Sequence, residues 1–212
     1  MTSSSLPVLP LPHPHILLPA SRLALPVDRS TGLALLDLLA ESEPLLVAVP
    51  VLPGPDDRID GFKLNEWGTA ARILRLVKST TPRRPDQTYL VTLEAAAPAR
   101  VRLVAPPAIK SPTPGKLLLL EIQYPTTTSI PSASLIEPFR SAAIALLDRL
   151  ARDSAQPVKK ETWTKLIGMV EDMSIQRALW MSDVLVSTAV PEYSDRLGVY
   201  IRLLCGNPPL TA

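Results

Sequence analysis

The chain opens with a proline-spaced apolar stretch from Leu6 to Pro19, Leu-Pro-Val-Leu-Pro-Leu-Pro-His-Pro-His-Ile-Leu-Leu-Pro. A stretch this apolar is expected to be buried when the chain folds. Proline recurs too often for an α-helix, because each ring removes a backbone donor and clashes with the preceding turn. An extended strand at a sheet edge tolerates these prolines, since the missing N–H groups then face outward. The stretch therefore predicts an irregular β structure. The chain carries no catalytic signature, which favours a binding function.

The composition is that of a folded protein with unusually many prolines. Hydrophobic residues make up 46% of the 212 positions, which argues against global disorder. The 24 prolines, against 8 glycines, fit many strand edges, turns and loop ends. The 22 basic and 20 acidic residues nearly cancel, so the charge balance does not predict a nucleic-acid partner.

The cysteine count and the hydropathy limit the cellular compartments in which we expect the protein. Cys205 is the single cysteine, which excludes an internal disulfide and a thiolate metal site and predicts a reducing compartment. No stretch approaches the roughly 20 apolar residues of a spanning helix, so we expect no membrane partner. The opening residues lack a basic region, and the prolines that follow argue against both a secretory signal and a mitochondrial presequence.

The first half of the chain has mainly strand-like patterns. One helix is expected from Ser30 to Ser42, capped by Asp28 or Ser30. The strand-like segments are short apolar runs or alternating stretches bounded by turn residues. They are Leu45–Val51, Gly68–Ser79, Tyr89–Glu94, Arg100–Val104 and Leu117–Tyr124, with a solvated hairpin loop at Thr80–Gln87.

Beyond Pro125 the pattern becomes helical. Thr126–Ser134 has the composition of a linker. Amphipathic helices are expected at Ile136–Arg152, Glu161–Met173 and Ser174–Val190, and Pro191 can open a fourth. The sequence therefore predicts an α+β protein, with a β domain over 1–128 and a helical subdomain, incomplete, over 135–212.

Several candidate ligand sites have simpler interpretations. His13 and His15 lie two apart, but no third metal ligand is evident nearby. Asp56, Asp57 and Asp60 cluster without the spacing of a calcium loop, which favours a solvated loop. The Pro7–Pro14 stretch resembles a polyproline ligand, but its Leu and Val side chains favour a strand edge. We therefore predict neither a metal nor a cofactor.

The remaining candidates concern basic, aromatic and thiol side chains. The one basic concentration comprises Arg72, Arg75, Lys78, Arg83 and Arg84. With 4% aromatic residues the chain lacks a stacking platform for single-stranded nucleic acid, so no nucleic-acid role is predicted. Large side chains at helical spacing usually pack, so Trp67, Trp163 and Trp180 are expected in a core or subdomain interface, and Cys205 is expected to be inert.

Three segments in this order resemble the amino-terminal part of the Lon proteases. The first is the opening stretch with Leu23–Val27, which is similar to the Pro-Leu-rich opening strands of that family. The second is Leu45–Val51 followed by Trp67–Val77, whose Gly-Thr-x-Ala-Arg-Ile pattern is the most specific. The third is Tyr89–Glu94 followed by Arg100–Leu103. The chain departs from the family pattern after Glu94, where Ala95 stands in place of glycine, so that turn must be built differently.

This resemblance implies a PUA-like β pseudo-barrel followed by a helical bundle. In the family, this region recognises unfolded or degron-bearing polypeptides and helps to assemble the hexamer. The chain contains no Gly-x-x-x-x-Gly-Lys-Ser/Thr stretch and no serine in the context of a Ser–Lys dyad, so we expect no enzymatic activity of its own. The expected role is therefore non-catalytic.

Two contexts for that role stay open. The first is a Lon-like ATP-dependent serine protease of fungal type, truncated here before its ATPase and protease domains. The second is a stand-alone LON-domain module that acts as a ubiquitin-ligase-type adaptor. The peroxisomal matrix is expected before the mitochondrial matrix, and the cytosol is an option for a truncated chain. The sequence does not identify the residues that contact substrate.

Overall fold

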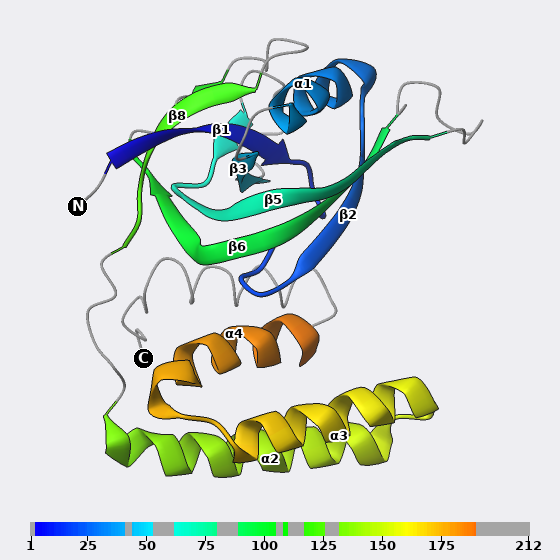
Figure 1. Cartoon of the computed structure of the whole chain (residues 1–212), viewed down its shortest axis with the longest axis vertical. Helices are drawn as coiled ribbons and strands as arrows, with labels where there is room; N and C mark the ends of the chain where they lie inside the picture. Colours follow the sequence, from blue (N-terminus) through cyan, green and yellow to red (C-terminus); the bar gives the residue numbers. More distant parts are fainter. Residues whose placement is uncertain are drawn as a thin grey trace. The chain divides into compact units, whose positions relative to one another are not determined.

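The computed structural model describes residues 3–40, 44–52, 62–79, 89–104, 108–109, 117–125 and 132–189 of the chain. These residues fall into two compact units, Met1–Thr126 and Thr127–Ala189 (Figure 1). We call them the β unit and the helical unit. Within the described parts of the chain, no helix has the length and apolar character that crossing a membrane requires.

In the β unit, the described residues form eight strands and one helix. The strands are β1 (Ser3–Leu11), β2 (Arg22–Val27), β3 (Leu45–Leu52), β4 (Phe62–Leu64), β5 (Trp67–Lys78), β6 (Tyr89–Leu103), β7 (Ala108–Ile109) and β8 (Leu118–Gln123), and the helix is α1 (Arg29–Leu39).

Five of these strands close into a ring. The neighbours run β1–β8–β6–β5–β3, and β3 pairs in parallel with β1 to complete the circuit. The other pairings around the ring are antiparallel. β2 pairs with β6 outside the ring, and β4 and β7 extend from β3. The predicted β pseudo-barrel and the α+β class are therefore confirmed.

The proline-rich opening strand, β1, changes its pairing partner midway along its length. Residues Ser3–Val8 of β1 pair with β8, and Val8–Leu11 pair with β3. Each half therefore has a described neighbour on one side only, and Pro7 and Pro10 lie in different halves. The expectation of an extended strand is confirmed. Each half is thus an edge locally, as expected, but the strand as a whole joins β8 to β3 and closes the barrel, which the sequence does not predict.

The longest strand, β6, contains two segments that the sequence predicts as separate strands. Tyr89–Glu94 and Arg100–Val104 were expected as separate strands, but both belong to β6. Its pairing with β5 jumps from Ala95 opposite Ala71 to Arg100 opposite Thr69. The intervening residues 96–99, with Pro98, form an irregularity inside the strand, where a proline does not interrupt the ladder. The departure from the family pattern after Glu94 is thus accommodated by this irregularity and not by a turn.

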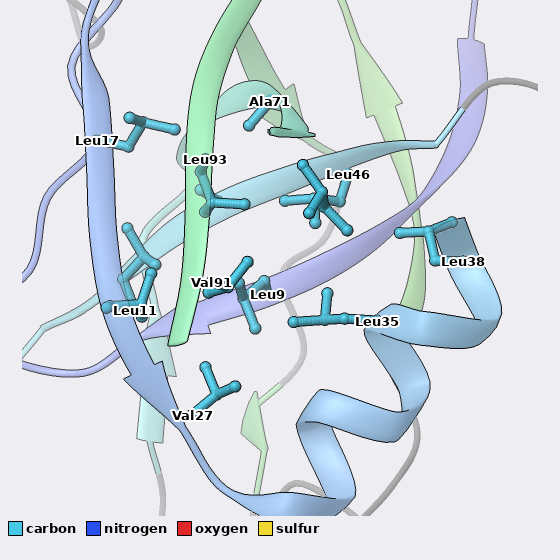
Figure 2. Packing of buried hydrophobic residues seen from close by; sticks show 13 residues of the cluster. Leu9, Leu11, Leu17, Val27, Leu35, Leu38, Leu46, Ala71, Val91 and Leu93 are labelled. Atoms are coloured by element: carbon cyan, nitrogen blue, oxygen red, sulfur yellow. The ribbon is translucent and has the colours of Figure 1, made fainter. Parts of the chain in front are cut away.

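Helix α1 packs against the barrel core (Figure 2). Asp28 caps it, since its carboxylate accepts hydrogen bonds from the Thr31 backbone N–H and hydroxyl, both at 2.8 Å. Figure 2 shows Leu35 and Leu38 on the side of α1 that faces the strands. Gly32 allows close approach, because a Cβ there would lie 2.3 Å from the ring of Tyr89. The expected helix and its Asp28 cap are confirmed.

The helical unit contains α2 (Ala133–Asp153), α3 (Pro157–Glu171), the short 3-10 helix η1 (Ile175–Arg177) and α4 (Ala178–Ala189). Pro157 opens α3 at its first turn, where a missing N–H costs nothing. The buried side chains form one cluster across the three α-helices, Ile136, Ala143, Leu147, Trp163, Leu166, Val170, Met173, Ala178, Met181 and Leu185.

Several helix boundaries differ from expectation. α1 ends at Leu39, where the helix is expected to extend to Ser42, and α3 begins at Pro157, four residues before the expected Glu161. α2 begins at Ala133, inside the expected linker, and residues 174–190 form η1 followed by α4 instead of one helix. The 3-10 turn tightens the chain between α3 and α4. The helix expected from Pro191 and most of the expected linker lie outside the described residues, as does the loop Thr80–Gln87.

Candidate functional site

A cleft of about 370 Å³ lies in the helical unit, where α3 ends and α4 begins. Its apolar lining comes from Met169 and Met173 and, across the turn, from Trp180 and Met181. Lys165, Asp172 and Arg177 line it with charged groups. Every lining residue belongs to the same unit, so the cleft is a property of the helical unit itself.

The local sequence explains the depth of the cleft. Met173 and Met181 are buried and form its inner part, whereas 42% of Met169 and 47% of Trp180 are exposed to solvent. Gly168 leaves space between them, because a Cβ built at this position would meet no atom within 4 Å. An apolar side chain that enters the cleft therefore has methionine and tryptophan side chains in its lining to contact.

The turn beneath the cleft is held by Arg140 of α2. Its guanidinium donates to the backbone carbonyls of Val170 at 3.3 Å and Met173 at 3.1 Å. It also pairs with Glu137 on its own helix. Carbonyls at the end of a helix have no partner within it, and a cation there is doubly favourable. Arg140 thus fixes the end of α3 and positions Met173.

The apolar part of the site is adaptable in shape. Methionine is unbranched and polarisable, so a methionine-lined surface can repack around side chains of different shape. Leu179, next to Trp180, is also 42% exposed. On the neighbouring turn of α3, the Lys165 ammonium lies 2.7 Å from the Glu161 carboxylate and lowers the pKa of Glu161 by hydrogen bonding and by its charge. This arrangement can hold an extended apolar segment with little sequence preference.

The structure does not assemble the histidine candidates into a metal site. His13 is exposed, and His15 is half-buried. Burial and, second, the charge of His13 lower the pKa of His15. Among the described residues no group of three or more His, Cys, Asp or Glu is placed to hold a metal ion. Asp56, Asp57, Asp60 and Cys205 lie outside the described residues.

The basic and proline-rich candidates lie on strands. Arg72, Arg75 and Lys78 are exposed along β5, while Arg83 and Arg84 lie outside the described residues. The first part of the Pro7–Pro14 stretch belongs to β1 and pairs with barrel strands, as the strand interpretation of this stretch predicts.

The tryptophans divide into three environments. Trp163 is buried in the helical core, as expected. Trp67 is half-buried, with the Arg102 guanidinium 5.9 Å from its ring centroid. Trp180 is 47% exposed and lines the cleft, so the expectation of a core position is wrong for this residue, and the alternative of a subdomain interface stays a prediction. The sequence did not predict the cleft, because the spacing of Met169, Met173 and Trp180 is also that of a buried helical face.

Comparison with known proteins points to one family. The family model described as the ATP-dependent protease La (LON) substrate-binding domain matches residues 5–193. The N-terminal domain of Lon protease from the Mycobacterium avium complex aligns over 97% of this chain and 100% of its own, with 17% identity and a TM-score of 0.50. At this identity the likeness supports the fold alone.

A second solved structure is similar over a smaller share. A Lon N-terminal domain protein from Xanthomonas campestris aligns over 84% of this chain and 96% of its own, with 17% identity and a TM-score of 0.43. The search among curated proteins finds no match.

Proposed function

The chain belongs to the family of ATP-dependent protease La (LON) substrate-binding domains, and on that premise we propose that it recognises unfolded or degron-bearing polypeptides. In this proposal the role is non-catalytic. The chain binds the client, and a Lon-like ATP-dependent serine protease unfolds and cleaves it elsewhere.

The observation that carries the proposal is the cleft of the helical unit with its exposed rim. Met169 and Trp180 both line the cleft and expose apolar surface beside each other's helices, where another molecule can cover it. Burying one large apolar side chain is worth about 1.5–3 kcal/mol, which is weak for a single contact. A client with several exposed apolar side chains gains affinity by repeated contact, whereas a folded protein offers few. The surface therefore favours unfolded chains.

Binding of an unfolded protein tests the proposal directly. The probe is fluorescently labelled α-lactalbumin in its reduced, carboxymethylated form, and the comparison is the native form at the same concentration. Anisotropy titrations of the full chain should show binding of the unfolded probe and little of the native one. Equal binding of both forms would contradict the proposal.

Variants at the cleft locate the binding surface. Trp180→Ala removes the largest exposed side chain of the rim, and Gly168→Leu fills the space above the buried methionines. Both should weaken binding of the unfolded probe about tenfold, the effect of roughly 1.4 kcal/mol. The matched control is Leu135→Ala on α2, an exposed leucine outside the cleft lining, which should leave affinity unchanged. Unchanged affinity in both cleft variants would remove the cleft from the proposal.

We further propose the protease context over the adaptor context. Family membership supports a LON-type domain in either one. The coding sequence around this chain distinguishes them, because a protease requires an in-frame Gly-x-x-x-x-Gly-Lys-Ser/Thr segment after the helical unit. Without that segment, the stand-alone ubiquitin-ligase-type adaptor becomes the better proposal.

The finer features of the parent protein are also proposals. They are a fungal-type enzyme, the peroxisomal matrix in preference to the mitochondrial matrix, and self-association in a hexamer. Co-localisation of the fluorescently tagged parent protein with a peroxisomal marker tests the compartment, and sedimentation of the parent protein tests the hexamer.

A further inference from the structure

Strand β2 forms a margin of the sheet in the β unit. Among the described residues, it pairs with β6 and with no other strand (Figure 1). Its outward residues Arg22, Ala24 and Pro26 are exposed, whereas Leu25 and Val27 are buried toward the core. One long side of this strand is therefore free of a described neighbour.

The hydrogen-bond alternation shows which backbone groups lie on the free side. The Ala95 N–H donates to the Ser21 carbonyl at 3.0 Å, so the Ser21 carbonyl faces β6, while the Ser21 N–H donates to the Leu18 carbonyl at 3.2 Å. The register continues without a shift from Arg22 opposite Glu94 to Val27 opposite Tyr89. Because hydrogen-bonded and open pairs alternate, Arg22, Ala24 and Pro26 direct their backbone groups to the free side. A proline fits such a position, since it has no N–H to leave unpaired.

The free side thus offers the backbone groups that strand addition requires. Arg22 and Ala24 each present an N–H and a carbonyl, and Pro26 presents a carbonyl. Extended peptides bind exposed sheet margins through main-chain hydrogen bonds of this kind, largely independently of sequence. Proteins usually protect such sheet edges against pairing with another strand by placing charged residues or proline there. Here Pro26 removes one donor, and two remain.

The face beside this margin carries an apolar row and an excess of positive charge. The register aligns Val77 of β5, Leu90 of β6 and Pro26 of β2 across the outward face. Another row aligns Arg72, Glu94 and Arg22, and the Arg22 guanidinium lies 2.7 Å from the Glu94 carboxylate.

Two arginines of β5 add to the excess of positive charge on this outward face. Arg75 is exposed beside this row, and within the described part of the chain neither Arg72 nor Arg75 has an ion-pair partner. Strands lie about 4.8 Å apart, so these two arginines stand about 14 Å from an added strand. They act on it through their long side chains and their field, which salt screens over about 10 Å.

We propose that the free side of β2 binds an extended, acidic segment of the client polypeptide by strand addition. This inference rests on the proposed function, because the occupant is a client segment, but it assigns a second binding surface to the other unit. Main-chain hydrogen bonds to Arg22 and Ala24 hold the segment, and the arginines of the outward face select acidic side chains.

A peptide series tests this assignment on the full chain. The probe is an eight-residue peptide of alternating valine and glutamate, blocked at both ends, and its match is alternating valine and lysine. The glutamate peptide should bind severalfold more tightly, and the difference should shrink as sodium chloride is raised. Equal affinities at low salt would overturn the charge selection.

Backbone methylation tests the strand pairing itself. N-methylation of alternate residues blocks hydrogen bonds on one side of a strand only. Methylating the set that faces β2 should weaken binding about tenfold, while methylating the other set should not. Equal effects of the two methylated peptides, whether strong or absent, would overturn the proposal, and this comparison needs no variant of the protein.

A protein variant gives the complementary test. Ala24→Pro removes the N–H on the free side without touching the ladder to β6, and Ala24→Ser is the control that keeps it. The proline variant should bind the glutamate peptide about tenfold more weakly, whereas the serine variant should bind it with unchanged affinity. Equal peptide binding by the two variants would contradict strand addition at Ala24.

The unfolded α-lactalbumin titration separates this inference from the proposed function. If the chain binds unfolded protein but not the glutamate peptide, the proposed function stands and the β2 site is wrong. If the chain binds the peptide in the predicted manner but no unfolded protein, strand addition stands and the client role is wrong.

Discussion

The two units of the chain bury their apolar residues in different ways. In the β unit the strands enclose a core in which Leu11, Leu25, Leu46 and Leu93 lose essentially all contact with solvent. In the described part of the helical unit, Leu147 is the only leucine or isoleucine buried to this degree, and large apolar side chains line an open cleft. A barrel closes on itself, whereas the small bundle of α2, α3 and α4 leaves part of its apolar surface uncovered.

This difference suggests a division of labour. The β unit has a fixed shape, so it can present a backbone margin in a constant geometry. The helical unit has an adaptable methionine surface, so it can accept apolar side chains of many shapes. Stability and adaptability are thus placed in separate parts of one chain, and four predictions examine the contrast.

The largest effect is expected for truncation of the barrel core. Leu46→Ala, at a fully buried position of β3, should lower the free energy of unfolding of the β unit by about 3–5 kcal/mol. Leu185→Ala on α4 should lower the free energy of unfolding of the helical unit by about 2 kcal/mol, because its smaller core relaxes more easily into the cavity that the substitution leaves. Hydrogen exchange under increasing urea measures each unit separately. An equal or larger loss at Leu185 would break the contrast.

Glycine-to-alanine substitutions should have opposite signs in the two units. A Cβ at Gly68 of β5 would lie 2.6 Å from Val47 Cγ1 and 2.9 Å from Val49 Cγ2, so Gly68→Ala should destabilise by about 1–3 kcal/mol. Gly168 of α3 has open space, and Gly168→Ala should stabilise by about 0.5–1 kcal/mol through helix propensity. Urea titrations check both signs, and destabilisation by both would show that the helical unit is as tightly packed as the barrel.

Substitutions at helix caps should also change the stability of the two units in opposite directions. Burial alone raises the pKa of the Asp28 carboxyl, but hydrogen bonds from Ser30 and Thr31 outweigh it and hold the pKa below its usual range. The ionised cap therefore stabilises α1 above the ordinary pKa of aspartate, and this contribution is lost as pH falls through the lowered value. Asp28→Ala should cost about 1 kcal/mol at neutral pH and less in acid.

The helical unit offers the reverse experiment. Gln156 precedes α3 without a side-chain capping bond, so Gln156→Asp should stabilise that unit by about 0.5–1 kcal/mol. Thermal unfolding followed by circular dichroism measures both changes. No gain from Gln156→Asp would mean that tertiary packing already fixes the start of α3.

The smallest effect concerns His15 in the β unit. Its pKa is lowered by burial and by the charge of His13, so the folded state favours the neutral imidazole. The unfolded chain then binds more protons, and stability should fall slightly as pH drops below about 6.5, the ordinary value for histidine. His15→Gln should remove this slope between pH 7 and 5. An unchanged slope in that variant would assign it to other groups.

Much of the β unit could be predicted because its local signals agree with its fold. The capping position of Asp28 and the apolar run Leu45–Val51 need only their neighbours in sequence to be interpreted. The division between β and helical parts likewise follows from a change of periodicity beyond Pro125. The join of two expected strands into β6 could not be predicted, because Pro98 is tolerated only through the pairing irregularity opposite β5.

The candidate site was less accessible to sequence analysis. Met169, Met173 and Trp180 have the spacing of an ordinary buried helical face, so the sequence alone suggests a core. Whether such a face is covered depends on which other elements pack against it, and the 3-10 turn between α3 and α4 leaves Met169 and Trp180 at an open cleft.

By itself, the sequence determined the α+β class, the extended course of the opening stretch and the helical character of the second half. These features follow from proline chemistry and hydrophobic periodicity, which act over a few residues. Only the tertiary structure decided that β1 closes a barrel by changing neighbour at Val8, that β2 pairs with β6 alone among the described strands, and that Trp180 is exposed. Each of these depends on contacts between residues far apart in the chain, which local pattern does not encode.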